Sequence, residues 1–202
     1  MTVTNMQARR RWFRGEEPEW VVWLLVIAML AIGLIARTVV VNRSTAFNAG
    51  NLSVAYPADW SALNEGNPDA IVAVGAPFDT GPFPARLIVQ QMPATRISTT
   101  AQRLGDLALQ WTDHQAEDLL GYKVLSIEPL AVRGKDAVRV DYVYITEPAF
   151  ATPNSVPLVA QGSDILVLEG DRMTVASMVA DADDFASLDR TWGRILASLE
   201  LK

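Results

Sequence analysis

The chain has 202 residues, no cysteine, a single histidine and a formal net charge of −6 at pH 7. The lack of cysteine excludes disulfides, thiolate metal sites and cysteine nucleophiles. Residues 44–202 hold 11 basic and 20 acidic residues, a net charge of −9, which disfavours nucleic acid as a partner. This part of the chain has a length that suits one domain with a single core.

Residues 20–41 form the most specific feature of the sequence. Residues 20–36 carry no charge, and three valines at 39–41 extend the apolar run. At ~1.5 Å per residue the uncharged run would extend roughly 25 Å, and the valines complete the ~30 Å of a bilayer core. The sequence therefore predicts a transmembrane helix. A cleaved secretory signal fits less well, because the apolar cores of signals are usually about 7 to 15 residues long.

The residues that flank this stretch predict its orientation. Four arginines lie within residues 9–14, whereas Arg37 and Arg43 follow it, so the positive-inside rule places the N-terminus in the cytoplasm. We therefore expect a single-pass protein of the plasma membrane whose C-terminal domain is periplasmic or extracellular. The expected parts are a basic cytoplasmic head (1–19), the membrane helix (20–41), a short tether (42–51) and the extracytoplasmic domain (52–202).

Local patterns predict four strands and then a helix in the first half of this domain. Alternating or continuous apolar residues indicate the strands, and Thr99 with Gln102 forms a capping box that predicts the start of the helix. Gly121 is placed to follow the end of that helix. The four expected strands are residues 52–56, 60–63, 71–74 and 86–92.

The second half predicts two hairpins and a closing helix. Strands at 122–132 and 137–146 flank a turn sequence at 133–136, and strands at 158–168 and 173–180 flank another at 169–172. Asp183 or Asp184 is expected to cap a helix that continues to residue 199. Because hairpins dominate the connections, we expect an α+β fold, a mostly antiparallel sheet covered by two helices, behind the single N-terminal transmembrane helix.

Several short motifs give the domain a family resemblance. The sequence YPADW at residues 56–60 resembles the strand start of PsbP-like domains, including the DcrB and LpqN type, and the segments GYKV (121–124), GKDAVRVDY (134–142) and ILASL (195–199) are similar to that pattern. The similarity spans about residues 50–200. It implies an α/β/α sandwich and a non-catalytic role in docking to, or assembling, a larger membrane complex. Photosystem relatives are separate lumenal proteins, whereas this sequence carries its own expected anchor.

Residues suited to catalysis or metal binding are few. His114 lies on the predicted first helix, but a general base or metal ligand needs partners from other segments, and the sequence indicates none. Asp181, Asp183 and Asp184 do not match the spacing of a calcium loop, and helix capping accounts for them. No serine-hydrolase motif and no glycine-rich phosphate loop occur in the sequence. We expect no enzyme activity, no cofactor and no metal.

Two proline-bearing loops, residues 76–84 and 147–157, are the best candidates for partner contacts. They carry Phe78, Phe83 and Phe150, which no amphipathic pattern assigns to a core. Aromatic side chains exposed on stiff loops are typical of binding surfaces, but these rings can equally fold back onto their own domain. With Trp20 and Trp23, expected at the membrane interface, the phenylalanines make up the predicted partner-binding set.

Three classes of function are compatible with these observations. The leading prediction is a non-catalytic accessory subunit of a photosynthetic or respiratory membrane complex, with membrane lipid and integral membrane subunits as its partners. The alternative is a membrane-tethered module that binds a small molecule or lipid in an apolar pocket lined by Trp111, Tyr142 and Tyr144. A hydrolase or metalloenzyme that uses His114 is placed last.

Overall fold

The computed structural model describes residues 19–41, 43–64, 68–76, 82–97, 103–148 and 155–201. The chain divides into two compact units, Met1–Arg43 and Ser44–Lys202. The first unit contains helix α1 (Glu19–Val41), so the apolar stretch is helical as expected. Large apolar side chains on α1 are solvent-exposed, for example Met29 at 68% and Leu34 at 62%.

Of two expectations about the N-terminal part, one is left without support and the other is contradicted. Within the described ranges, no helix is both long enough and apolar enough to cross a membrane, so the structure gives no support to the transmembrane span expected at 20–41. The tether expected at 42–51 instead contains strand β1 (Ser44–Ala49), which pairs antiparallel with β2 (Leu52–Pro57). Its sequence shows little apolar alternation, but the backbone pairing needs none, and Phe47 packs against the core.

The remaining strands are β3 (Ser61–Ala62), β4 (Ala70–Gly75), β5 (Arg86–Pro93), β6 (Lys123–Val132), β7 (Lys135–Thr146), β8 (Leu158–Glu169), β9 (Arg172–Asp181) and β10 (Glu200–Leu201). In the described chain they form a seven-stranded antiparallel sheet of order β3-β4-β5-β9-β8-β7-β6, and β10 joins β1 and β2 in a smaller sheet. The antiparallel sheet of the expected α+β fold is thus confirmed.

Both expected hairpin turns are present. Gly134 links β6 to β7 with φ of 81°, and Gly170 links β8 to β9 with φ of 62°. These backbone angles favour glycine, which explains why the turn sequences were recognisable. The tight turns set the pairing of the long strands at the centre of the sheet.

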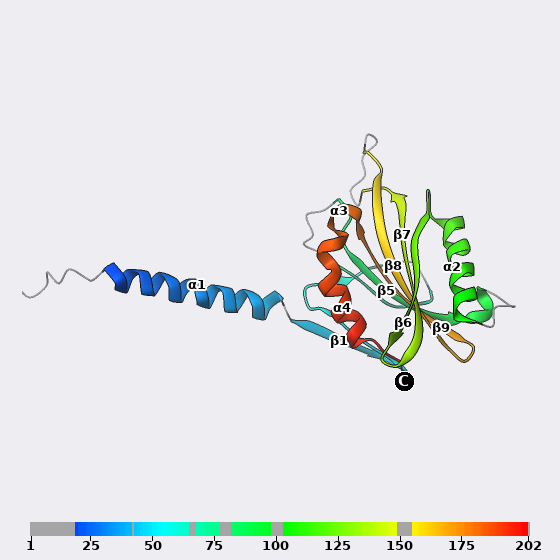
Figure 1. The fold of residues 1–202 in the computed structure, drawn as a ribbon, viewed down its shortest axis with the longest axis horizontal. Helices are drawn as coiled ribbons and strands as arrows, with labels where there is room; N and C mark the ends of the chain where they lie inside the picture. The colour runs from blue at the N-terminus through cyan, green and yellow to red at the C-terminus, as the bar shows by residue number, and fades with distance from the viewer. Residues whose placement is uncertain are drawn as a thin grey trace, which may run out of the picture. The chain divides into compact units, whose positions relative to one another are not determined.

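Helices cover the two faces of the main sheet. They are the 3-10 turn η1 (Ala94–Arg96), α2 (Leu104–Asp118), α3 (Ala182–Phe185), the 3-10 turn η2 (Ala186–Leu188) and α4 (Asp189–Ser198). Figure 1 shows α2 on one side of the strands and α3 with α4 on the other. Buried side chains confirm this arrangement, since Trp111 of α2 and Trp192 of α4 belong to separate apolar clusters.

The helix boundaries differ from those expected. The capping box at Thr99 lies outside the described residues, and α2 begins at Leu104 without a side-chain cap. The closing helix is broken into α3, η2 and α4, and its first cap is Asp181, whose carboxylate accepts a hydrogen bond of 3.0 Å from the Asp183 backbone N–H. Asp183 and Asp184 lie in the first turn, where acidic residues favour the helix dipole.

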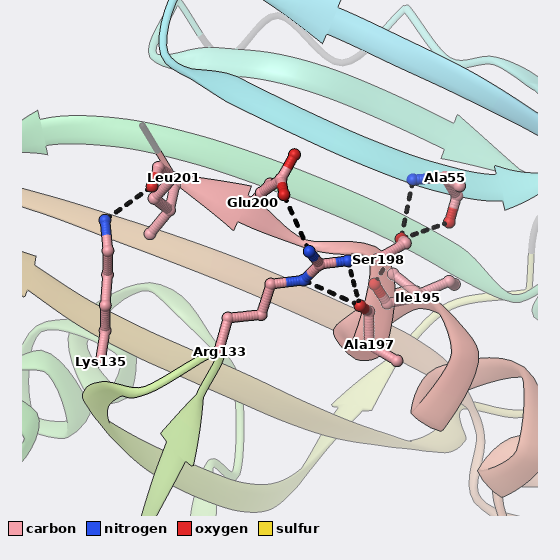
Figure 2. A network of polar contacts seen from close by, with 8 residues as sticks. All are labelled: Ala55, Arg133, Lys135, Ile195, Ala197, Ser198, Glu200 and Leu201. Atoms are coloured by element: carbon pink, nitrogen blue, oxygen red, sulfur yellow. Dashed lines mark hydrogen bonds and ion pairs between the residues drawn. The ribbon is translucent and has the colours of Figure 1, made fainter.

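A polar network at the end of the β6–β7 hairpin holds the C-terminal segment in place (Figure 2). The Arg133 guanidinium donates to the Ala197 carbonyl at 2.8 Å and 3.1 Å and to the Glu200 carboxylate at 2.8 Å. Lys135 donates to the Leu201 carbonyl at 2.7 Å. The Arg133 bonds satisfy a carbonyl at the end of α4, which has no partner within the helix, and the network links the main sheet to β10 of the smaller sheet.

Candidate functional site

A cleft of about 630 Å³ lies beside α2, over the face of the main sheet that this helix covers in part. Helix α2 packs against β6, β7 and β8. Strands β5 and β9, which come next in the sheet, supply floor residues such as Ile88, Gln90 and Ser177. Trp111 of α2 and the tyrosines of β7 form a wall. The cleft therefore exists because one helix is too narrow to cover a seven-stranded sheet.

Strand alternation explains which side chains face the cleft. On β5, Leu87 and Val89 belong to the cluster under α4, whereas Arg86, Ile88 and Gln90 line the cleft. Successive residues of a strand point to opposite faces, so one strand supplies both the core and the site. Arg86 and Gln90 thereby become polar groups on a mostly apolar sheet surface.

A buried carboxyl group anchors the aromatic wall. Asp164 of β8 has no exposed surface. It accepts hydrogen bonds from Trp111 Nε1 at 2.7 Å and from the Tyr142 hydroxyl at 3.0 Å. Burial raises the pKa of Asp164, and hydrogen bonds from Trp111, Ser177, Tyr142 and Gln115 act in the opposite direction. Asp164 therefore positions the indole of α2 and the phenol of β7 relative to each other.

Gly162 makes room for the Tyr142 ring. The two residues are direct partners in the β7–β8 pairing, and a Cβ atom at Gly162 would lie 2.3 Å from Cζ of Tyr142. The tyrosine therefore lies across the glycine and approaches Asp164. Tyr122 continues this aromatic cluster, with its ring centroid 5.1 Å from that of Tyr142. The Tyr122 hydroxyl is buried and has no hydrogen-bond partner among the described residues, and burial raises its pKa.

Charged groups lie around the aromatic wall. The guanidinium carbon of Arg86 lies 4.6 Å from the ring centroid of Phe83, a cation–π distance. Arg96 forms an ion pair with Asp69, and both line the cleft. His114 is exposed at the same cleft. The site thus combines an aromatic wall with charged groups of both signs, since Asp69 and Asp118 also line the cleft. This combination suits recognition of a polar small molecule.

No group of three His, Asp or Glu residues in the described part of the chain is arranged to hold a metal ion. His114 belongs to the cleft through α2, and its ring centroid lies 6.2 Å from that of Trp111. This geometry places His114 beside an aromatic ring at an exposed position.

Three of the five predicted partner-binding residues lie in the described structure. Trp20 and Trp23 are exposed on α1 at 65% and 67%. Phe83 is 4% exposed and packs near Ala160 and Val179, so for this ring the structure shows the fold-back alternative. Phe78 and Phe150 lie outside the described residues.

Part of the cleft lining could be named from the sequence. Trp111, Tyr142 and Tyr144 line one cleft, as the small-molecule alternative expected. Its lining is more polar than an apolar pocket, because Arg86 and other polar residues take part. Sequence reasoning missed Asp164, although a single carboxylate within the apolar strand at 158–168 was a usable signal, since buried charges need partners.

Comparison with known proteins establishes the class of fold. No protein-family model and no curated protein matches the chain. Among solved structures, cyanobacterial PsbP (CyanoP) from Synechocystis sp. PCC 6803 is 10% identical with a TM-score of 0.53, over 79% of this chain and 92% of that one. At this identity the likeness shows the fold alone, and the Ser44–Lys202 unit has a PsbP-like fold.

Two further structures share this fold. The Ran-binding protein Mog1p from Saccharomyces cerevisiae is 10% identical with a TM-score of 0.54, over 79% of this chain and 95% of Mog1p. Protein PA94 of Pseudomonas aeruginosa, whose function is unknown, is 14% identical with a TM-score of 0.53, over 80% of this chain and 99% of PA94. Proteins of this fold come from a cyanobacterium, a yeast and a proteobacterium, so the fold by itself specifies no single activity.

Proposed function

We propose that this chain is a non-catalytic, single-pass accessory subunit of a larger membrane complex. Helix α1 is its anchor, and the Ser44–Lys202 unit docks from the extracytoplasmic side. The observation that carries the proposal is the exposed apolar surface of α1. Between Trp20 and Ile35, every large aliphatic and aromatic side chain except Val21 is more than 40% accessible. A helix that is apolar on all faces is stable only when lipid or apolar protein covers it.

Other observations support the same function. The uncharged run at 20–36 offers no ionisable group for transport, so anchoring or lateral packing is its simplest use. One protein of the same fold, Mog1p, is named for binding another protein. The photosynthetic or respiratory nature of the host complex rests on the family resemblance.

Membrane fractionation followed by alkaline carbonate extraction tests the anchor. We expect the chain to stay in the membrane pellet. Leu30→Arg places a charge within the apolar run, which costs about 3 kcal/mol for a membrane-inserted helix, and should shift the protein toward the soluble fraction. Leu120→Arg is the matched control, because Leu120 is an exposed leucine of the other unit, at 72%, and should not change the distribution. Release of the unmodified chain by carbonate would contradict the anchor.

Single-cysteine labelling tests the orientation, and the cysteine-free sequence makes it unambiguous. In intact cells, a membrane-impermeant maleimide should label Asp113→Cys in the exposed part of α2 and should spare Thr2→Cys at the N-terminus. Permeabilisation should allow both to react. The reverse labelling pattern would place the domain in the cytoplasm.

Co-purification in mild detergent tests the docking role. A tagged chain should migrate as part of a larger assembly and bring defined membrane subunits with it. Leu30→Arg should lose these subunits if α1 is part of the interface, whereas Leu120→Arg should retain them. Migration of the chain solely as a monomer would contradict an accessory-subunit role.

A second candidate function, binding of a small molecule, is favoured by the cleft beside α2. Its volume of about 630 Å³ falls within the ~300–1,000 Å³ of ligand pockets, and such pockets combine aromatic walls with a few polar groups. Ile88→Trp would fill the floor and should abolish binding of cleft ligands, measured by ligand-observed NMR. Val159→Trp, at a position that is 52% exposed, is the control of equal size. Ligand binding that Ile88→Trp leaves unchanged would exclude the cleft as its location.

A further inference from the structure

We propose that the cleft beside α2 recognises a small organic carboxylate with a planar or apolar body, and that Arg86 binds its carboxylate group. This inference rests on the second proposed function, binding of a small molecule in the cleft, and specifies the chemistry of the ligand. The main evidence is that the Arg86 guanidinium, which stacks on Phe83, lines the same cleft as the aromatic wall of Trp111 and Tyr142.

Arg86 is held in place by its neighbours. It is the first residue of β5, and the pairing with β9 sets it opposite Val179. Its guanidinium carbon lies 4.6 Å from the centroid of Phe83, and Phe83 is itself 4% exposed and packed near Ala160 and Val179. Stacking orients the plane of the guanidinium, which reduces the entropy lost when a ligand binds.

The shape of a guanidinium selects the ligand group. Five N–H donors lie at its edge, in a fork that matches the two oxygens of a carboxylate, while the stacked face is occupied by Phe83. The five N–H donors of Arg86 are enough to bind a ligand carboxylate and also to make contacts within the protein. The side chain of the second arginine of the cleft, Arg96, is 55% exposed, so water screens its charge. Arg86, which is stacked on the buried Phe83 ring, is the better anchor.

The rest of the site favours a singly charged ligand with a ring or a short apolar body. The Tyr142 hydroxyl and the Trp111 indole are both fixed by Asp164, and both residues are nearly fully buried, so they form a rigid aromatic backing to the cleft. Residues 44–202 carry a net charge of −9, which repels highly charged anions over a distance. A monocarboxylate avoids most of this repulsion and still gains the bidentate contact with Arg86.

The test uses the full chain in lipid nanodiscs, with empty nanodiscs subtracted to remove partition of the probes into lipid. Aromatic and short aliphatic carboxylates, among them benzoate and indole-3-acetate, are compared with their primary amides by ligand-observed NMR and calorimetry. We expect the carboxylates to bind at least tenfold more tightly than the matched amides, because the amides lack the charge and the second acceptor.

Variants assign the effect to Arg86. Arg86→Gln should weaken carboxylate binding at least tenfold, and Arg86→Lys should give an intermediate loss, since lysine keeps the charge but not the fork. Arg172→Gln, at an exposed arginine that begins β9 and does not line the cleft, is the matched control and should change binding less than twofold. Circular dichroism and thermal unfolding of each variant check that the domain still folds.

The outcomes separate this inference from the function on which it rests. If amides bind as tightly as carboxylates, and Ile88→Trp abolishes both, the carboxylate inference is overturned while the cleft remains a ligand site. Carboxylate binding that Arg86→Gln leaves unchanged also overturns it. If no probe of either series shows binding that Ile88→Trp removes, both the inference and the second proposed function fail.

Discussion

The two faces of the main sheet are closed in different ways, as two adjacent residues of β8 show. Ser163 points to the α4 face, where its hydroxyl accepts a hydrogen bond of 3.3 Å from Trp192 Nε1. Asp164 points to the α2 face, where its carboxyl group accepts one of 2.7 Å from Trp111 Nε1. On each face a helix tryptophan bonds to the middle of the sheet, but one acceptor is a hydroxyl and the other a buried acid.

The residues around these two hydrogen bonds also differ between the faces: apolar on the α4 face and partly polar on the α2 face. The α4 face is closed by apolar side chains from α3, α4 and the smaller sheet, among them Leu52, Phe185 and Ile195, all nearly fully buried. The α2 face has an apolar part under α2 and, beside it, the cleft with its charged and aromatic lining. We infer that the α4 face mainly supplies stability, whereas the α2 face gives up some stability to keep polar groups in fixed positions.

The largest difference is expected from alanine substitutions at the two β8 positions. Asp164→Ala leaves the Trp111 indole and the Tyr142 hydroxyl buried without their acceptor, which should lower the free energy of unfolding by about 3 kcal/mol or more. Ser163→Ala removes one long bond to Trp192 and should cost about 1 kcal/mol. Urea unfolding followed by circular dichroism measures both. Equal losses would contradict the assignment of a tightly coupled network to the α2 face.

A pair of glycines tests how closely the α2 face is packed. Gly162→Ala forces a methyl group against the Tyr142 ring and should cost about 1–3 kcal/mol, with a loss of near-UV dichroism from the displaced aromatic cluster. A Cβ atom at Gly193 in α4 would meet no atom within 4 Å beyond the adjoining helix backbone, so Gly193→Ala should instead stabilise the domain by about 1 kcal/mol through helix propensity. If Gly162→Ala left the free energy of unfolding unchanged, Tyr142 would be able to move away from Asp164.

Replacement of each helix tryptophan by phenylalanine isolates the two indole bonds. Both changes remove a similar volume, but Trp111→Phe also leaves a buried carboxyl group short of one donor. It should lower the free energy of unfolding by about 1–3 kcal/mol more than the size change alone, against about 1 kcal/mol or less for Trp192→Phe. Chemical unfolding measures the free energy of unfolding of both variants. A larger loss for Trp192→Phe than for Trp111→Phe would contradict the proposed difference between the two faces.

Local sequence patterns were sufficient for most of the sheet. The turns around Gly134 and Gly170 and the apolar run of β5 are local features, so the hairpins and the strand expected at 86–92 follow from neighbouring residues. Strand β1 was missed because its pairing with β2 shows only weakly in its own side chains. The break between α3 and α4 was also missed, since the apolar spacing continues across it.

The candidate site needed more than local patterns. Trp111, Tyr142 and Tyr144 could be grouped in advance because a helix and a strand of one layer were expected to meet. Arg86 and Asp164 join them only through the strand order β5-β9-β8-β7, which pairs segments far apart in the chain. No single-segment pattern contains that order. Asp164 could have been singled out as a carboxylate within an apolar strand, but its grouping with Arg86 and the aromatic wall could not be predicted.

The pH dependence of stability gives a smaller test of the buried acid. Burial raises the pKa of Asp164 in the folded domain above the ordinary value of 3.8. Between the ordinary and the raised pKa the folded state therefore binds more protons than the unfolded state, so this group's stabilising contribution is complete at low pH and is lost as pH rises through the folded pKa. Other carboxylates also titrate, so the comparison must be with Asp164→Asn.

We expect the stability of the wild type minus that of Asp164→Asn to decrease as pH rises from the ordinary carboxyl range, with a slope of at most about 1.4 kcal/mol per pH unit. Urea unfolding of both proteins across a pH series measures this difference. An increase with rising pH would mean that the hydrogen bonds to the carboxylate outweigh its burial. The Asp164 pKa would then be lowered in the folded state.

The smallest effect is expected at the C-terminal network of Figure 2, which closes the α4 face with polar contacts. Arg133 is 47% exposed and Glu200 44%, so water screens the ion pair, and Arg133→Ala should cost less than about 1 kcal/mol. Arg190→Ala, an exposed arginine of α4, is the control and should cost at most about 0.5 kcal/mol. Hydrogen exchange is the sharper measurement, because β10 should lose protection in Arg133→Ala while α4 keeps it. If β10 and α4 lost protection together with a large loss of global stability, the polar network rather than apolar packing would hold the α4 face closed.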